Sequence, residues 1–156
     1  MKFSLPVLRT SFAAGILLAV FGIFSSIAVS QSGSMETLQP EELVKILQSP
    51  KSAQPVILNV GPHMLYSQAH IPGAEYIGAG SSAEGIDLLR TRVKALPHST
   101  FIVLYCGCCP WDRCPNVRPA YKELKTLGFT NVKLLYIADN FGDDWAYKGY
   151  PVVKGQ

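Results

Sequence analysis

A dominant charge of one sign is missing from this chain. Only 16% of its 156 residues are Asp, Glu, Lys or Arg, and only three are histidine. Lys2 and Arg9 lie in a leading segment without acidic residues, so residues 31–156 carry 12 basic and 11 acidic side chains. The sequence also has no basic stripe interleaved with aromatic residues. We therefore expect no nucleic-acid partner.

Internal repeats and low-complexity tracts are also absent from the sequence. Hydrophobic residues make up 48% of the chain, which is enough apolar material for a core. The length indicates one domain with an extension rather than two domains.

Only the N-terminal region contains a long uncharged apolar run. Lys2 and Arg9 form a basic start, "FAAGILLAVFGIF" follows as an apolar segment, and Ala28, Val29 and Ser30 supply the small residues of a cleavage site. This order is typical of an export signal that is removed before Gln31.

We therefore predict a signal peptide over 1–30, a polar linker over 31–36 and one domain over 37–154. An uncleaved membrane anchor over 12–29 is the alternative, and it would be the protein's only contact with a membrane. In either case the domain is exported, periplasmic or secreted, where thiols can be oxidised.

The domain alternates buried-strand and helix patterns. Three short apolar runs rich in β-branched residues predict strands covered on both faces, namely 55–60, 101–105 and 132–137. Helical spacing of apolar residues begins at Pro40, recurs over 83–96, and recurs again from an expected N-cap at Asn116 to a stop at Gly128. The order predicts an α/β domain with a central parallel sheet flanked by helices.

Outside one stretch of nine residues the chain has no cysteine. That stretch contains four: Cys106, Cys108, Cys109 and Cys114. Cys106 directly follows the run 101–105, and the next helix begins near Asn116, so the thiols lie at the carboxyl end of a parallel strand, where open α/β sheets bind ligands. The helix dipole would stabilise a thiolate there, and we expect Cys106 to have the lowest pKa.

Several motifs in order resemble one family over about residues 37–154. They are "VILNV", "QAHIPGAEYIG", "FIVLYC", "LKTLGFTNVKLL" and "DDWAYKGYPVV". Together they resemble the rhodanese-like sulfurtransferases. The resemblance implies a three-layer domain without a cofactor or metal. It also implies a strand-end cysteine, Cys106 by position, that takes sulfane sulfur from a donor such as thiosulfate and hands it to cyanide or a thiol.

The loop departs from the family pattern in length and composition. Between Cys106 and Gly128 it is longer than in a typical member, and Pro110 and Pro115 remove two amide donors. The first core strand ends in Asn-Val-Gly, with Gly61 last, where the family often has Asp-Val-Arg.

The other loop residues have several candidate roles. Cys108 stands five residues before Arg113, as the family nucleophile commonly does, so Cys108, Cys109 and Cys114 are alternative nucleophiles or resolving thiols. We expect Cys109 to attack a Cys106 persulfide, and a thiol reductant protein then to restore the oxidised loop. The candidates for substrate binding are Arg113 and Arg118, which would hold an anionic donor, and Trp111, which would wall the pocket or cover its floor.

Two alternatives remain open. The loop could serve a non-enzymatic thiol module that binds Zn²⁺, Cu(I) or a partner, or acts as a redox switch, although adjacent Cys108 and Cys109 suit a zinc site poorly. Phosphatase chemistry is disfavoured because related enzymes place Arg six residues after the cysteine, where Asp112 follows Cys106.

Overall fold

The computed structural model describes residues 1–2 and 35–155. The predicted signal peptide and cleavage site, and residues 31–34 of the predicted linker, lie outside the described residues. Within the described part, no helix combines the length and the apolar character needed to cross a membrane.

A five-stranded, wholly parallel sheet organises the domain, with strand order β1-β5-β4-β2-β3. The strands are β1 (Thr37–Leu38), β2 (Val56–Asn59), β3 (Glu75–Tyr76), β4 (Ile102–Tyr105) and β5 (Val132–Leu135). β4 lies in the middle, where Leu104 pairs with Leu58 of β2 and with Leu134 of β5. The three predicted strands are present, each slightly shorter than its apolar run.

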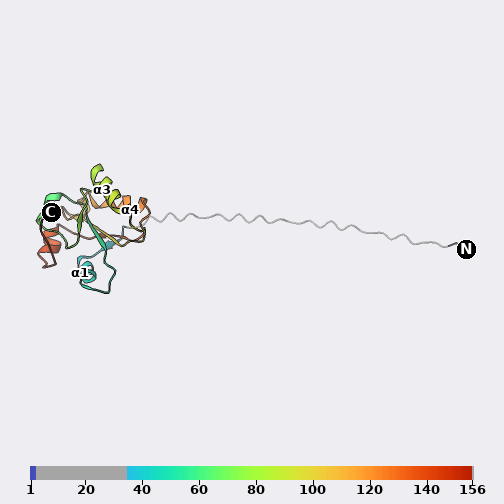
Figure 1. Cartoon of the computed structure of the whole chain (residues 1–156), viewed down its shortest axis with the longest axis horizontal. Coiled ribbons are helices and arrows are strands. Elements are labelled where there is room, and N and C mark those ends of the chain that lie inside the picture. The colour runs from blue at the N-terminus through green and yellow to red at the C-terminus, as the bar shows by residue number, and fades with distance from the viewer. Residues whose placement is uncertain (3–34, 156) are drawn as a thin grey trace. The chain divides into compact units, whose positions relative to one another are not determined.

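Helices lie on both faces of this sheet. They are α1 (Pro40–Gln48), α2 (His63–Gln68), α3 (Ala83–Val93) and α4 (Val117–Thr126), with a 3₁₀ turn η1 (Trp111–Arg113) and a π-type turn η2 (Gly142–Ala146). Figure 1 shows α1 on one side of the sheet and α3 and α4 on the other. The predicted α/β architecture with a central parallel sheet is confirmed.

Local signals set the helix ends. At α3 the side chain of Ser82 accepts a hydrogen bond from the backbone N–H of Gly85 at 3.0 Å. α4 is stopped by Gly128, whose φ of 88° most other residues avoid, and the N–H of Phe129 then bonds back to the carbonyl of Leu124 at 3.0 Å.

Two apolar clusters cover the two faces of the sheet. Neighbouring residues of a strand point to opposite faces, so Leu104 joins the cluster under α3 and α4, while Val103 joins the one under α1. Both residues are fully buried. This explains why the central strands read as continuous apolar runs rather than as alternating patterns.

The short elements β1 and α2 have no periodicity that predicts them. β1 contains two residues and depends on pairing with β5, where Leu38 is opposite Leu135. The C-terminal end of α2 is fixed by His70, which stacks on Tyr66 at 3.8 Å and bonds the Tyr66 carbonyl through Nδ1 at 2.8 Å. The backbone N–H of His70 also donates to the carbonyl of Val153 at 2.9 Å, a contact from a distant part of the chain.

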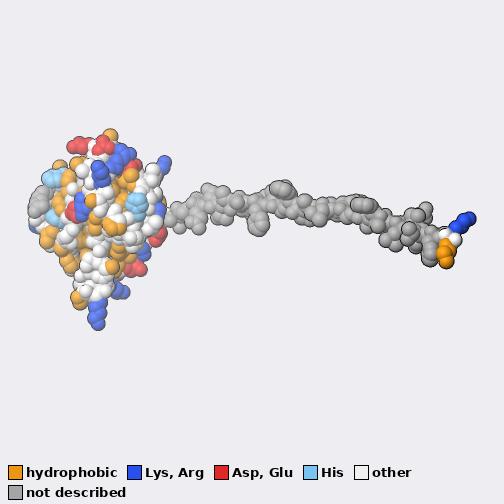
Figure 2. Space-filling model, turned by 45° about the vertical axis from the view of Figure 1, so that its right-hand side comes forward, with side chains coloured by type: hydrophobic (Ala, Val, Ile, Leu, Met, Phe, Trp, Pro, Cys, Tyr) orange, Lys and Arg blue, Asp and Glu red, His pale blue; other side chains and the backbone are white. Residues whose placement is uncertain are grey.

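Charged side chains on the surface alternate in sign. On the face drawn in Figure 2, Lys and Arg side chains are interspersed with Asp and Glu. That distribution agrees with the near-equal counts over residues 31–156.

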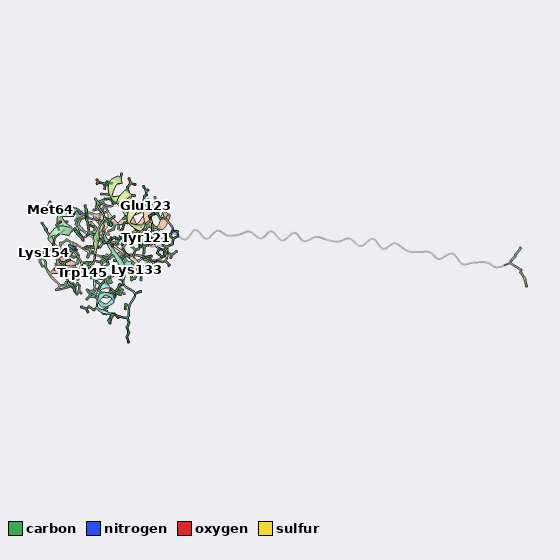
Figure 3. The ribbon with its side chains drawn as sticks, in the orientation of Figure 1. Met64, Tyr121, Glu123, Lys133, Trp145 and Lys154 are labelled. Carbon is green, nitrogen blue, oxygen red and sulfur yellow. The ribbon has the colours of Figure 1, made fainter. Side chains whose placement is uncertain are left out.

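Trp145, labelled in Figure 3, should contribute strongly to stability. Its side chain is fully buried, and its indole N–H donates to the carbonyl of Pro151 at 2.8 Å. We expect Trp145→Ala to lower the free energy of unfolding by about 3–5 kcal/mol, measured by urea denaturation, because it leaves a large cavity. Tyr147→Ala is the matched control, since Tyr147 is 84% exposed. Equal losses for the two variants would contradict this account of the core.

Candidate active site

Cys106 lies directly after the central strand and is only 4% exposed. The next residue, Gly107, turns the chain with a φ of 73°, and its carbonyl accepts a hydrogen bond from the N–H of Phe141 at 3.0 Å. A Cβ on Gly107 would lie 2.7 Å from Cβ of Phe141. Position 107 therefore requires glycine for two reasons, its positive φ and the lack of room for a side chain.

Trp111 anchors the middle of the loop. Its backbone N–H donates to the carbonyl of Ala138 at 2.9 Å, and its ring packs 5.1 Å from the ring of Tyr136. Arg118 donates to the Trp111 carbonyl at 3.1 Å, and its guanidinium lies 5.6 Å from the indole centroid. Arg118 therefore braces the loop from the first turn of α4. Arg113 is exposed at the end of η1, and donor binding by either arginine stays a prediction.

The fold brings the sulfurs of the loop together. The Sγ atoms of Cys106, Cys108 and Cys114 all lie within 4.8 Å of one another, and none of the four cysteines is in a disulfide. Cys108 lies 3.2 Å from Cys106 and 2.9 Å from Cys109, measured between Sγ atoms. Three thiols at this separation also have the composition that a soft metal ion prefers.

Asn116 is a site residue that the sequence pattern did not reveal. It is 3% exposed, and its amide nitrogen donates to the sulfur of Cys106 at 3.3 Å. Its side-chain oxygen accepts from the backbone N–H of Ser81 at 3.1 Å. Asn116 does occupy the N-cap position, but its side chain makes no capping bond. The predicted N-cap position is therefore confirmed, but the side-chain capping bond is absent because the amide turns toward the thiols instead.

Gly61 gives Cys106 its space on the other side. A Cβ on Gly61 would lie 3.0 Å from Sγ of Cys106 and 3.1 Å from its carbonyl oxygen. The N–H of Gly61 is held by the side-chain oxygen of Asn59 at 3.0 Å. Glycine at this position thus allows the thiol and its loop to approach the end of β2 closely.

The family model of the rhodanese-like domain matches residues 39–136. The chain belongs to the rhodanese-like domain family. No curated protein matches it significantly.

Solved structures share the fold of this rhodanese-like domain. A rhodanese-like domain of the Alr3790 protein from Anabaena sp. is 22% identical, with a TM-score of 0.57 over 78% of this chain and 80% of that one. The BH2092 protein from Bacillus halodurans is 21% identical, with a TM-score of 0.59 over 76% and 77%. At these identities the likeness establishes the fold alone.

The pKa values of the thiols in this rhodanese-like domain differ from those that the sequence predicts. The pKa of Cys114 is lowered to about 5, because its sulfur accepts hydrogen bonds from the Cys106 thiol and from the backbone N–H groups of Val117 and Asn116. The pKa of Cys106 is raised, because Cys114 holds its proton and because the site is buried. The expectation that Cys106 has the lowest pKa is therefore wrong. The backbone N–H groups at the start of α4 lower the pKa of Cys114 rather than that of Cys106.

Cys106 and Cys114 consequently share one negative charge at neutral pH. Cys109 differs from both, since burial and its bond to Cys108 raise its pKa to about 12. Cys106, Cys109, Cys114 and Trp111 line a small cavity of about 10 Å³, which is the room that one water molecule requires. A sulfur donor must therefore move the loop, or approach from the half-buried Cys108, to reach Cys106.

The shared thiolate can be measured by ultraviolet thiolate absorbance against pH. We expect an absorbance step near pH 5, because the Cys114 sulfur is stabilised as an anion as the pH rises through its pKa. Cys114→Ser should remove that step, while Cys109→Ser should keep it. A wild-type protein whose thiolate absorbance appears only in the ordinary range of a free thiol would contradict the assignment.

Proposed function

We propose that this protein is a sulfurtransferase that carries sulfane sulfur as a persulfide on Cys106. The supporting observation is the position of Cys106 at the carboxyl end of the central strand of a rhodanese-like domain, with the sulfurs of Cys108 and Cys114 within 4.8 Å of its own. The raised pKa keeps Cys106 in the thiol form, so this thiol needs a proton acceptor as it attacks, and the ionised Cys114 lies within 4.8 Å of it.

The loading step balances with thiosulfate as the donor. Sγ of Cys106 bonds to the outer sulfur of thiosulfate, the S–S bond of the donor breaks, and sulfite leaves with the electron pair. The proton of Cys106 passes to the thiolate of Cys114. The negative charge of the pair thereby moves onto the new persulfide, and no external base is needed.

Nearby donors would stabilise that persulfide. Asn116 donates its amide to the sulfur of Cys106 at 3.3 Å, and the backbone N–H of Cys108 favours the charged form of this sulfur. Arg118 is engaged with the Trp111 carbonyl, so we assign attraction of the anionic donor to the exposed Arg113. The sulfur then passes to an acceptor such as cyanide or a thiol.

Sulfite formation tests the proposal directly. With reduced protein and thiosulfate under anaerobic conditions, we expect one equivalent of sulfite per chain, because each Cys106 is loaded once. Cys106→Ser should form at least 100-fold less in the same time, an estimate on the order of what loss of a nucleophile costs. Cys109→Ser is the matched control and should behave as wild type. Sulfite formation by Cys106→Ser at the parent rate would show that another thiol is the nucleophile.

A second candidate function is a non-enzymatic thiol module that holds a soft metal ion or switches its redox state. It is favoured by the spacing of Cys106, Cys108 and Cys114, whose sulfurs lie within 4.8 Å of one another. A native mass adduct with Cu(I) or Zn²⁺, combined with no sulfite formation, would support this module over the enzyme.

We further propose that the protein is exported to a periplasmic or secreted location, on the evidence of the leading segment. N-terminal sequencing of the protein from a producing cell should begin at Gln31, because the small residues Ala28 to Ser30 suit cleavage. An intact Met1 terminus in the membrane fraction would contradict cleavage and indicate the anchor instead.

A further inference from the structure

Cys114 is the loop thiol that reaches Cys106 from a different element. It precedes α4 by three positions and lines the same small cavity as Cys106. The Sγ atoms of Cys114 and Cys106 lie within 4.8 Å of each other, and both residues are buried, with exposures of 7% and 4%. Two sulfurs are thus held together in a site that is nearly closed to water.

We infer that Cys114 is the resolving thiol of this loop, so that the protein releases hydrosulfide from a Cys106 persulfide and closes a Cys106–Cys114 disulfide. This inference rests on the proposed function, since it needs the persulfide to form. It replaces the sequence-based assignment of this role to Cys109.

The remaining thiols are less suited to the role. Cys109 lies outside the group of three sulfurs within 4.8 Å, and its sulfur contacts Cys108 at 2.9 Å instead. Cys108 is close to Cys106, but only Gly107 separates the two. A bridge between them would have to form across a turn already fixed by the bond between Gly107 and Phe141. Disulfides forced from their preferred geometry are strained and more easily reduced.

The chemistry balances without an oxidant. After loading, Cys106 carries an anionic persulfide and Cys114 carries the proton. Sγ of Cys114 attacks Sγ of Cys106, the inner-to-outer sulfur bond breaks, and the outer sulfur leaves with the electron pair and that same proton as hydrosulfide. The two thiols are oxidised to a disulfide while the sulfane sulfur is reduced to sulfide.

A dithiol reductant is the partner that this cycle requires. The disulfide must accept two electrons and two protons before Cys106 can be loaded again, and a cysteine-pair protein or a small dithiol supplies both. Transfer to cyanide, in contrast, leaves the thiols reduced. The loop would therefore act as a sulfane-sulfur reductase whenever no external acceptor captures the persulfide first.

The sequence offers a clean readout of the disulfide. Trypsin cleaves after Arg113, so Cys106, Cys108 and Cys109 lie in the peptide 95–113, while Cys114 starts the peptide 114–122. A Cys106–Cys114 bridge links two peptides. Any bridge among the other three cysteines stays within one peptide.

The experiment uses the reduced full chain, freed of reductant, with thiosulfate under anaerobic conditions. Wild type should yield one equivalent each of sulfite and sulfide, lose two hydrogens in intact mass, and give the linked peptides. Cys114→Ser, incubated until one equivalent of sulfite has formed, should release no sulfide and should gain one sulfur atom. Cys109→Ser should match wild type. Cys114→Ala serves as a second variant, and circular dichroism checks that both variants fold.

The outcomes separate this inference from the proposed function. Sulfite without sulfide from wild type, or a bridge confined to peptide 95–113, would overturn the role of Cys114 while leaving the sulfurtransferase intact. Sulfide release that survives in Cys114→Ser but is lost in Cys109→Ser would also overturn it. If no variant forms sulfite, the proposed function itself fails.

Discussion

The pairing of β4 between two parallel neighbours is the constraint on which the site depends. Because β4 bonds β2 on one edge and β5 on the other, its last residue, Tyr105, is held in the middle of the sheet and is 1% exposed. The following thiol therefore starts from a rigid and buried point. From there the loop leaves the sheet, and its later residues are each held in place by a separate contact.

The backbone N–H groups of the loop and of the start of α4 act on two different sulfurs. The backbone N–H of Cys108 favours the thiolate form of Cys106, whereas those of Asn116 and Val117 favour the thiolate form of Cys114 and lower its pKa. Pro110 and Pro115 donate none. If all of these N–H groups stabilised one thiol, that thiol would act as a simple nucleophile. When two thiols divide the N–H groups, they form a pair that holds one proton. One thiol of the pair can then act as a base or as a resolving group for the other.

The loop is held by contacts from distant parts of the chain. Phe141 donates to the carbonyl of Gly107, Ala138 accepts from Trp111, and Ser81 donates to the side chain of Asn116. Arg118 closes the set by bonding Trp111 from α4. The thiols are therefore kept together by contacts across the folded domain, and not only by their closeness in the sequence.

Sequence alone was sufficient for the three central strands of the sheet and for the location of the thiols, but not for the two short edge strands, β1 and β3. Apolar runs such as 101–105 are long and unbroken enough to identify buried strands, and the glycine at 128 identifies a helix end. Which thiol the helix amides contact, and where the amide of Asn116 points, depended on tertiary structure. These properties arise from atoms of four separate segments meeting at one sheet edge, and a linear pattern contains no information on the direction of a hydrogen bond between them.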